Sequence, residues 1–129
     1  MNNSTAVVDR TAVLASARAF ADAVAHTPAV SEYTEAVSAV RADAAAIDLL
    51  QNAEQLRRTI HLNGGAQNNP DEQQQLMSLE ADIAAHPALQ RFFAAQQDLI
   101  QQLRSVNAGL TEALGFDFAS MARPACSCG

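Results

Sequence analysis

The side chains best suited to chemistry are two cysteines in the last four positions, Cys126-Ser127-Cys128-Gly129. They are the only cysteines of the 129-residue chain. Thiolates bind soft metals and iron–sulfur clusters, and they also undergo redox exchange. A disulfide across one intervening residue would be strained and would close too small a loop to stabilise a fold. The pair therefore indicates half of a metal or iron–sulfur site, a redox pair, or a terminus without a ligand role.

We predict Cys126 and Cys128 as metal ligands with an incomplete shell. Zinc needs four ligands and a cubane cluster takes four thiolates, so a second tail or a partner would have to supply the rest. No other catalytic grouping stands out. The sequence lacks a Ser-His-Asp set, a Glu-x-x-His pair and a phosphate-binding glycine loop. It therefore predicts no enzyme.

The histidines and the central acids have structural explanations. His26 and His86 each precede a helix-breaking proline, where a histidine favours the carbonyl end of the preceding helix. We expect both to cap helices and His61 to lie at the surface. Four acids at helical spacings favour a solvated face over a metal site: Glu32, Glu35, Asp43 and Asp48.

Helices must position all of these residues, because apolar side chains recur at spacings of three and four along the chain. We expect one helix from about Ser4 to Ala25 and a second, continuous one from Pro28 to Leu62, roughly 50 Å long at 1.5 Å per residue. Asn63-Gly64-Gly65 ends the second helix. A short third helix begins at Pro70, and a fourth runs from Pro87 to Gly115.

The expected fold is all-α. It is an elongated antiparallel bundle of about four helices, one or two of them long, and it is oligomeric. Residues 1–120 form one helical domain, and residues 121–129 form a flexible cysteine-containing tail whose base is docked by Phe116 and Phe118. The predicted seam between the helices consists of Tyr33, Val37, Val40, Leu99, Leu103 and Leu110.

Composition supports association between chains. Apolar residues make up 49% of the sequence, but many are alanines, and aromatic residues make up only 5%. Alanine-rich helices bury little surface in one chain, so a homo-oligomer, or a hetero-oligomer with a related helical subunit, would bury more. The net charge of −6 and the scattered arginines argue against direct binding of nucleic acid. No apolar stretch predicts a membrane segment or a leader, so we expect a cytoplasmic protein.

The whole pattern resembles the YlbF/YmcA family of small helical regulators. The resemblance spans most of the chain through Ala19-Phe20-Ala21, Tyr33, Ala36, Val40, Asp43 and Leu49-Leu50, then Leu76, Leu79, Ile83, Pro87-Ala88-Leu89, Phe92, Ala95-Gln96, Leu99, Leu103 and Val106-Asn107. It implies an all-helical subunit that forms homo- or hetero-oligomers. In bacilli such subunits assemble with partners that influence competence, sporulation, biofilm formation and ribonuclease Y-dependent RNA maturation.

The resemblance also implies a role for the tail. Some members help hold iron–sulfur clusters through cysteines near the C-terminus, a placement that Cys126 and Cys128 match. Two cysteines are half the usual ligand set, so a cluster here would be shared between chains. We therefore predict a non-enzymatic regulatory or adaptor subunit that acts through protein–protein interaction, in control of RNA processing or developmental gene expression. The alternative is a thiol-based metal, iron–sulfur or redox module presented by the tail.

Overall fold

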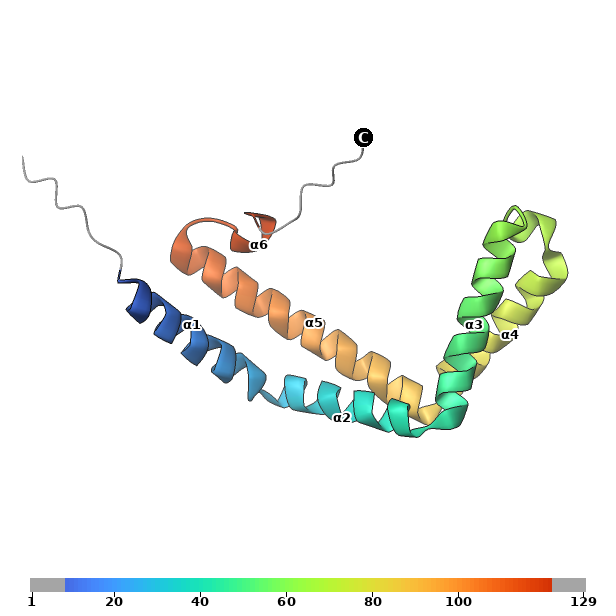
Figure 1. The fold of residues 1–129 in the computed structure, drawn as a ribbon, viewed down its shortest axis with the longest axis horizontal. Coiled ribbons are helices and arrows are strands. Elements are labelled where there is room, and N and C mark those ends of the chain that lie inside the picture. The colour runs from blue at the N-terminus through green and yellow to red at the C-terminus, as the bar shows by residue number, and fades with distance from the viewer. Residues whose placement is uncertain (1–8, 122–129) are drawn as a thin grey trace, which may run out of the picture.

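The computed structural model describes residues 9–121 (Figure 1). This part of the chain is helical, with no strand, so the predicted all-α class is confirmed. The elements are α1 (Arg10–Ala25), α2 (Pro28–Ala42), α3 (Ala44–Leu62), a 3-10 turn (Ala66–Asn68), α4 (Pro70–Ala85), α5 (Pro87–Leu114) and the single turn α6 (Phe118–Met121).

Prolines and cap residues set most helix boundaries, as the sequence predicts. α2, α4 and α5 each begin with proline at the first helical position, where its missing N–H costs no hydrogen bond. Gly64 and Gly65 have φ of +90° and +94° at the turn after α3, and the Gly65 N–H donates to the Ile60 carbonyl at 2.8 Å. Gly115, at φ +75°, ends α5 in the left-handed conformation expected of a C-terminal glycine.

Two predicted boundaries were wrong. α1 begins at Arg10, because Asp9 is extended and its carboxylate accepts from the Thr11 and Ala12 amides at 3.0 and 3.3 Å. The continuous helix predicted from Pro28 to Leu62 is broken at Asp43, which has φ −105° and ψ 100°. The Asp43 carboxylate accepts from the Ala46 amide at 3.1 Å and so caps a new helix.

The break at Asp43 divides the described helices into two antiparallel units joined at an elbow (Figure 1). In one unit, which we call the arm, α5 runs antiparallel to α1 and α2. In the other, which we call the hairpin, α3 and α4 pack antiparallel to each other. The strongest packing is therefore within the arm and within the hairpin, and one cluster of buried side chains from α2, α3, α4 and α5 runs through the elbow between them.

The core is thin, as the alanine content predicts. Nine hydrophobic residues are buried in the described part, four of them alanines, and Leu89 is the only large side chain with no exposed surface. The predicted seam is partly confirmed. Val40 is buried, and Tyr33, Val37, Leu99 and Leu110 are half-buried.

The prediction that Leu103 is buried in the seam was wrong, since its side chain is 46% exposed. It lies beyond the part of α5 that α2 covers, so no helix of the same chain buries it. Phe116 is also 48% exposed, so about half of its side chain is uncovered, and the side chain of Phe118 lies outside the described part of the structure.

Candidate interaction surfaces

The two cysteines, Cys126 and Cys128, lie outside the described residues. The structure therefore leaves the metal-ligand prediction and the boundary of the tail as predictions. Within residues 9–121, no three histidine, cysteine or carboxylate side chains converge in a way that could hold a metal ion.

The histidines occupy the helix ends that the sequence predicts. His26 caps α1, and its Nδ1 lies 2.6 Å from the Asp22 carbonyl oxygen. His86 stands between α4 and α5, and its side chain contacts the other junction of the elbow. Its Nε2 lies 3.5 Å from Oδ2 of Asp43. His61 is exposed, as expected.

The contact between Asp43 and His86 joins the two junctions of the elbow. Asp43 separates α2 from α3, and His86 separates α4 from α5. One carboxylate oxygen of Asp43 caps α3 while the other faces His86. The same residue therefore ends the arm, starts the hairpin and contacts the return junction.

An arginine clamp ties α2 to α5 in the arm. Arg91 Nε donates to Oε1 of Glu32 at 2.7 Å, and its Nη2 donates to Glu32 Oε2 at 3.0 Å and Glu35 Oε2 at 3.1 Å. The hydrogen bonds from Arg91 lower the pKa of Glu32, and the two glutamates raise the pKa of Arg91. Tyr33 and Phe92 pack beside this clamp with ring centroids 5.8 Å apart. The acids of α2 are thus paired with Arg91 and do not gather around an ion.

The outer half of the arm leaves large apolar side chains uncovered. α5 has 28 residues and α2 has 15, so α2 can cover only about half the length of α5. α1 lies beyond α2 and buries none of its residues. We call the exposed side chains of this region the open arm surface: Val13, Leu14, Phe20, Leu103, Leu114 and Phe116, which are 44–53% exposed.

The open arm surface holds six of the nine large hydrophobic side chains exposed in the described part of the chain. Val13 and Phe20 lie on the same side of α1 at helical spacing, and Leu103 and Leu114 continue the side of α5 that buries Leu89. Each of the two helices therefore presents an apolar face that no other helix of residues 9–121 buries.

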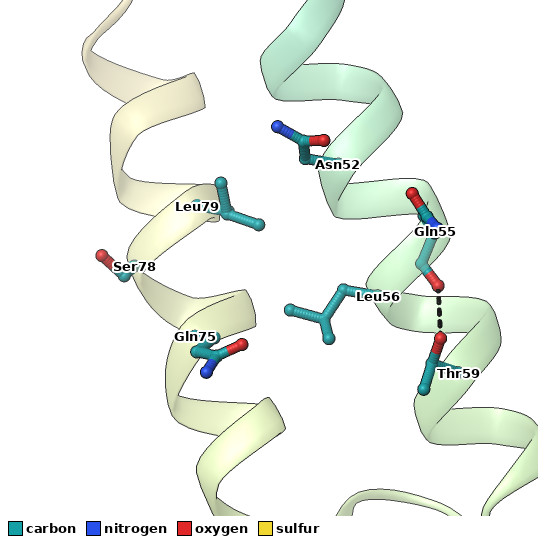
Figure 2. Close-up of a pocket in the computed structure, with 7 residues that line it drawn as sticks. All are labelled: Asn52, Gln55, Leu56, Thr59, Gln75, Ser78 and Leu79. Carbon is teal, nitrogen blue, oxygen red and sulfur yellow. Dashed lines mark hydrogen bonds between the residues drawn. The ribbon is translucent and has the colours of Figure 1, made fainter.

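The hairpin carries a second surface, hollowed between α3 and α4. One cavity of about 530 Å³ is lined from α3 by Asn52, Gln55, Leu56 and Thr59 and from α4 by Gln75, Ser78 and Leu79 (Figure 2). Leu56 and Leu79 point toward each other between the two helices (Figure 2). An adjoining cavity of about 550 Å³ shares Asn52 and reaches the elbow along Ala45, Asp48, Leu49, Asp82 and His86. Together they form what we call the hairpin groove.

Sequence reasoning missed the clamp, the elbow and the hairpin groove. The clamp joins residues 56–59 positions apart, and nothing in the local pattern pairs Arg91 with Glu32. The elbow did leave a signal, because the apolar stripe of the predicted second helix shifts after Ile47. Asp43 is also a residue type typical of an N-cap, and a helix capped by it would begin at Ala44 and bury Ala46 in its first turn.

The comparison with protein families gives one match. A family model described as "Control of competence regulator ComK, YlbF/YmcA" matches residues 13–115. These residues run from α1 to the end of α5 and include the clamp, the elbow, the hairpin groove and all of the open arm surface except Phe116. A search of curated proteins and a search of solved structures found no match.

Proposed function

Because the chain belongs to the YlbF/YmcA family, we propose that it is a non-enzymatic regulatory subunit that acts through protein–protein association. The family is described as one that controls a competence regulator, which supports a regulatory role. The proposal extends to control of developmental gene expression or RNA processing. No helix in residues 9–121 is long and apolar enough to cross a membrane.

The open arm surface is the observation that carries this proposal. Exposed apolar patches of this kind mark sites of protein association. A second copy is a suitable partner, since an identical arm offers the same unpaired α1 and α5 faces. Two arms packed about a twofold axis would bury Leu103 and Leu114 against the corresponding helices of the other copy.

Sedimentation equilibrium at micromolar concentration tests the association. We expect the wild-type chain to form a dimer or a larger species. The variant Leu103→Glu plus Leu114→Glu should be monomeric and still helical by circular dichroism, because both side chains are exposed within one chain.

The matched control is Gln101→Glu plus Ser105→Glu, which adds the same charge at exposed positions on the opposite side of α5. This control should associate like the wild type. A wild-type chain that stays monomeric, or equal association by both double variants, would refute an interface at the open arm surface.

A further inference from the structure

The hairpin groove has an apolar floor and an acidic rim. Leu49, Leu56 and Leu79 are half-buried and pack against the core of the hairpin. Asp48 of α3 and Asp82 of α4 line the elbow end of the groove and are exposed. Along α3 the groove follows positions spaced like a heptad seam, which is the pattern of a surface that packs against a helix: Ala45, Leu49, Asn52, Leu56 and Thr59.

The acidic charge of the groove is not neutralised within the described part of the chain. Residues 44–86 hold six acids and two arginines, a net charge of −4 in a chain of net charge −6. Both arginines are already engaged, Arg57 with Glu80 and Arg58 with Glu54. No arginine of residues 9–121 pairs with Asp48 or Asp82.

The geometry points to a basic amphipathic helix of a partner protein as the occupant of the hairpin groove. Its apolar face would cover Leu49, Leu56 and Leu79, and its flanking lysines or arginines would meet Asp48 and Asp82. The groove extends over 15 residues of α3, about 20 Å, which fits four turns of a helix. A second copy's hairpin is a poor occupant, because two surfaces of net charge −4 repel each other.

This inference rests on the proposed function, since it names the kind of partner that the regulatory subunit would bind. It assigns separate binding roles to the arm and to the hairpin. The open arm surface holds copies of the chain together, and the hairpins project from the elbow with their grooves free for the partner.

A defined peptide tests the groove. The probe is a fluorescein-labelled 18-residue helical peptide with leucines at its a and d positions and lysines at the flanking e and g positions. A second peptide carries glutamates in place of the lysines. We expect fluorescence anisotropy to show saturable binding of the basic peptide to the full chain, and binding of the acidic peptide that is weaker by about tenfold or more.

Two single variants locate the binding site. Asn52→Arg places a long cation inside the groove and should weaken binding of the basic peptide about tenfold or more. Gln101→Arg adds the same charge at an exposed position of α5 in the arm and should change binding by less than about twofold. Equal effects of the two variants would overturn the assignment.

The charges are tested separately. Asp48→Asn plus Asp82→Asn should weaken binding several-fold more than Asp98→Asn plus Glu112→Gln, which removes two negative charges from α5. A peptide of residues 9–27 from this chain, which contains α1 with Arg10 and Arg18, serves as a competitor. If it displaced the basic peptide and bound more tightly than it, a second copy's α1 would be the occupant and the inference would be wrong.

The same assay separates this inference from the proposed self-association. The Leu103→Glu plus Leu114→Glu variant should bind the basic peptide as the wild type does, because both substitutions lie on the arm. Loss of peptide binding in that variant, with helicity unchanged, would contradict a groove formed within one hairpin. A monomeric wild-type chain that still bound the basic peptide would refute the open arm interface alone.

Discussion

Single residues add polar contacts across the arm and the elbow, beside a thin apolar core. Arg91 makes three hydrogen bonds to two glutamates of α2, in a planar geometry that lysine could not reproduce. Asp43 uses its two carboxylate oxygens for two separate tasks, the cap of α3 and the contact with His86. At both positions, the contribution to the fold comes from the hydrogen-bonding groups of the side chain and not from buried apolar surface.

The clamp predicts how stability depends on pH. The pKa of Glu32 is lowered in the fold by its hydrogen bonds to Arg91, so the folded chain holds this carboxylate ionised more readily than the unfolded chain does. Its stabilising contribution is present above the ordinary glutamate pKa of about 4.3 and is lost as the pH falls through the lower folded value.

Arg91→Gln should therefore lower Tm at pH 7, and the difference from wild type should shrink as the pH falls below about 4. Thermal melts followed by circular dichroism at the two pH values measure this. Arg104→Gln, which removes an exposed arginine of α5 with no ion pair in the described residues, is the control. A difference that stays constant with pH would mean that Glu32 is not the group that Arg91 stabilises.

We predict a metal site at Cys126 and Cys128, which lie outside the described residues. Within residues 9–121, no three metal-binding side chains come together that could hold an ion. Two copies joined through their arms would bring four thiols to one assembly, the number that a four-iron cluster takes. We expect anaerobically purified protein to contain iron and sulfide, or zinc, and to lose them on Cys126→Ser plus Cys128→Ser. The measurement is metal analysis together with an ultraviolet–visible spectrum. Metal-free wild-type protein, alone and with its native partners, would leave the pair with no ligand role.

At the scale of elements, burial decides what each apolar position contributes. α5 follows one apolar rhythm from Leu89 to Leu114, yet α2 buries only the first half of it. Leu89 has no exposed surface, whereas Leu103 is 46% exposed. α1 shows the same limit, because its apolar face is regular and none of it is buried.

Leu89→Ala should consequently destabilise the fold by about 2–5 kcal/mol, as truncation of a buried leucine generally does. Leu62→Ala removes the same atoms from a side chain that is 82% exposed, and it should change stability by less than about 0.5 kcal/mol. Urea unfolding of the two variants at a concentration that keeps wild type in one association state measures the difference. Similar midpoints for both would show that the α2–α5 contact does not form the core of the arm.

At the scale of the whole molecule, the elbow separates two roles. The arm pairs helices that are distant in sequence and ends in uncovered apolar faces, and the hairpin pairs helices that are adjacent in sequence and carries the acidic groove. Because most of the exposed large apolar side chains lie in the arm and most of the net negative charge lies in the hairpin, the proposed association with a second copy and the proposed binding of a basic partner would use different parts of one chain.

The sequence by itself determined the helical class, the proline-started helices, the glycine stops, the thin core and the family, because these depend on local propensity and on spacing along the chain. It also predicted the cap at His26 and the exposure of His61, whereas the His86 side chain contacts Asp43. Tertiary structure decided which apolar faces are covered, where Asp43 breaks the long helix, how Arg91 reaches Glu32, and that α3 and α4 enclose a groove. Each of these depends on residues brought together from distant positions, and periodicity within one helix carries no information about which partner its apolar face will meet.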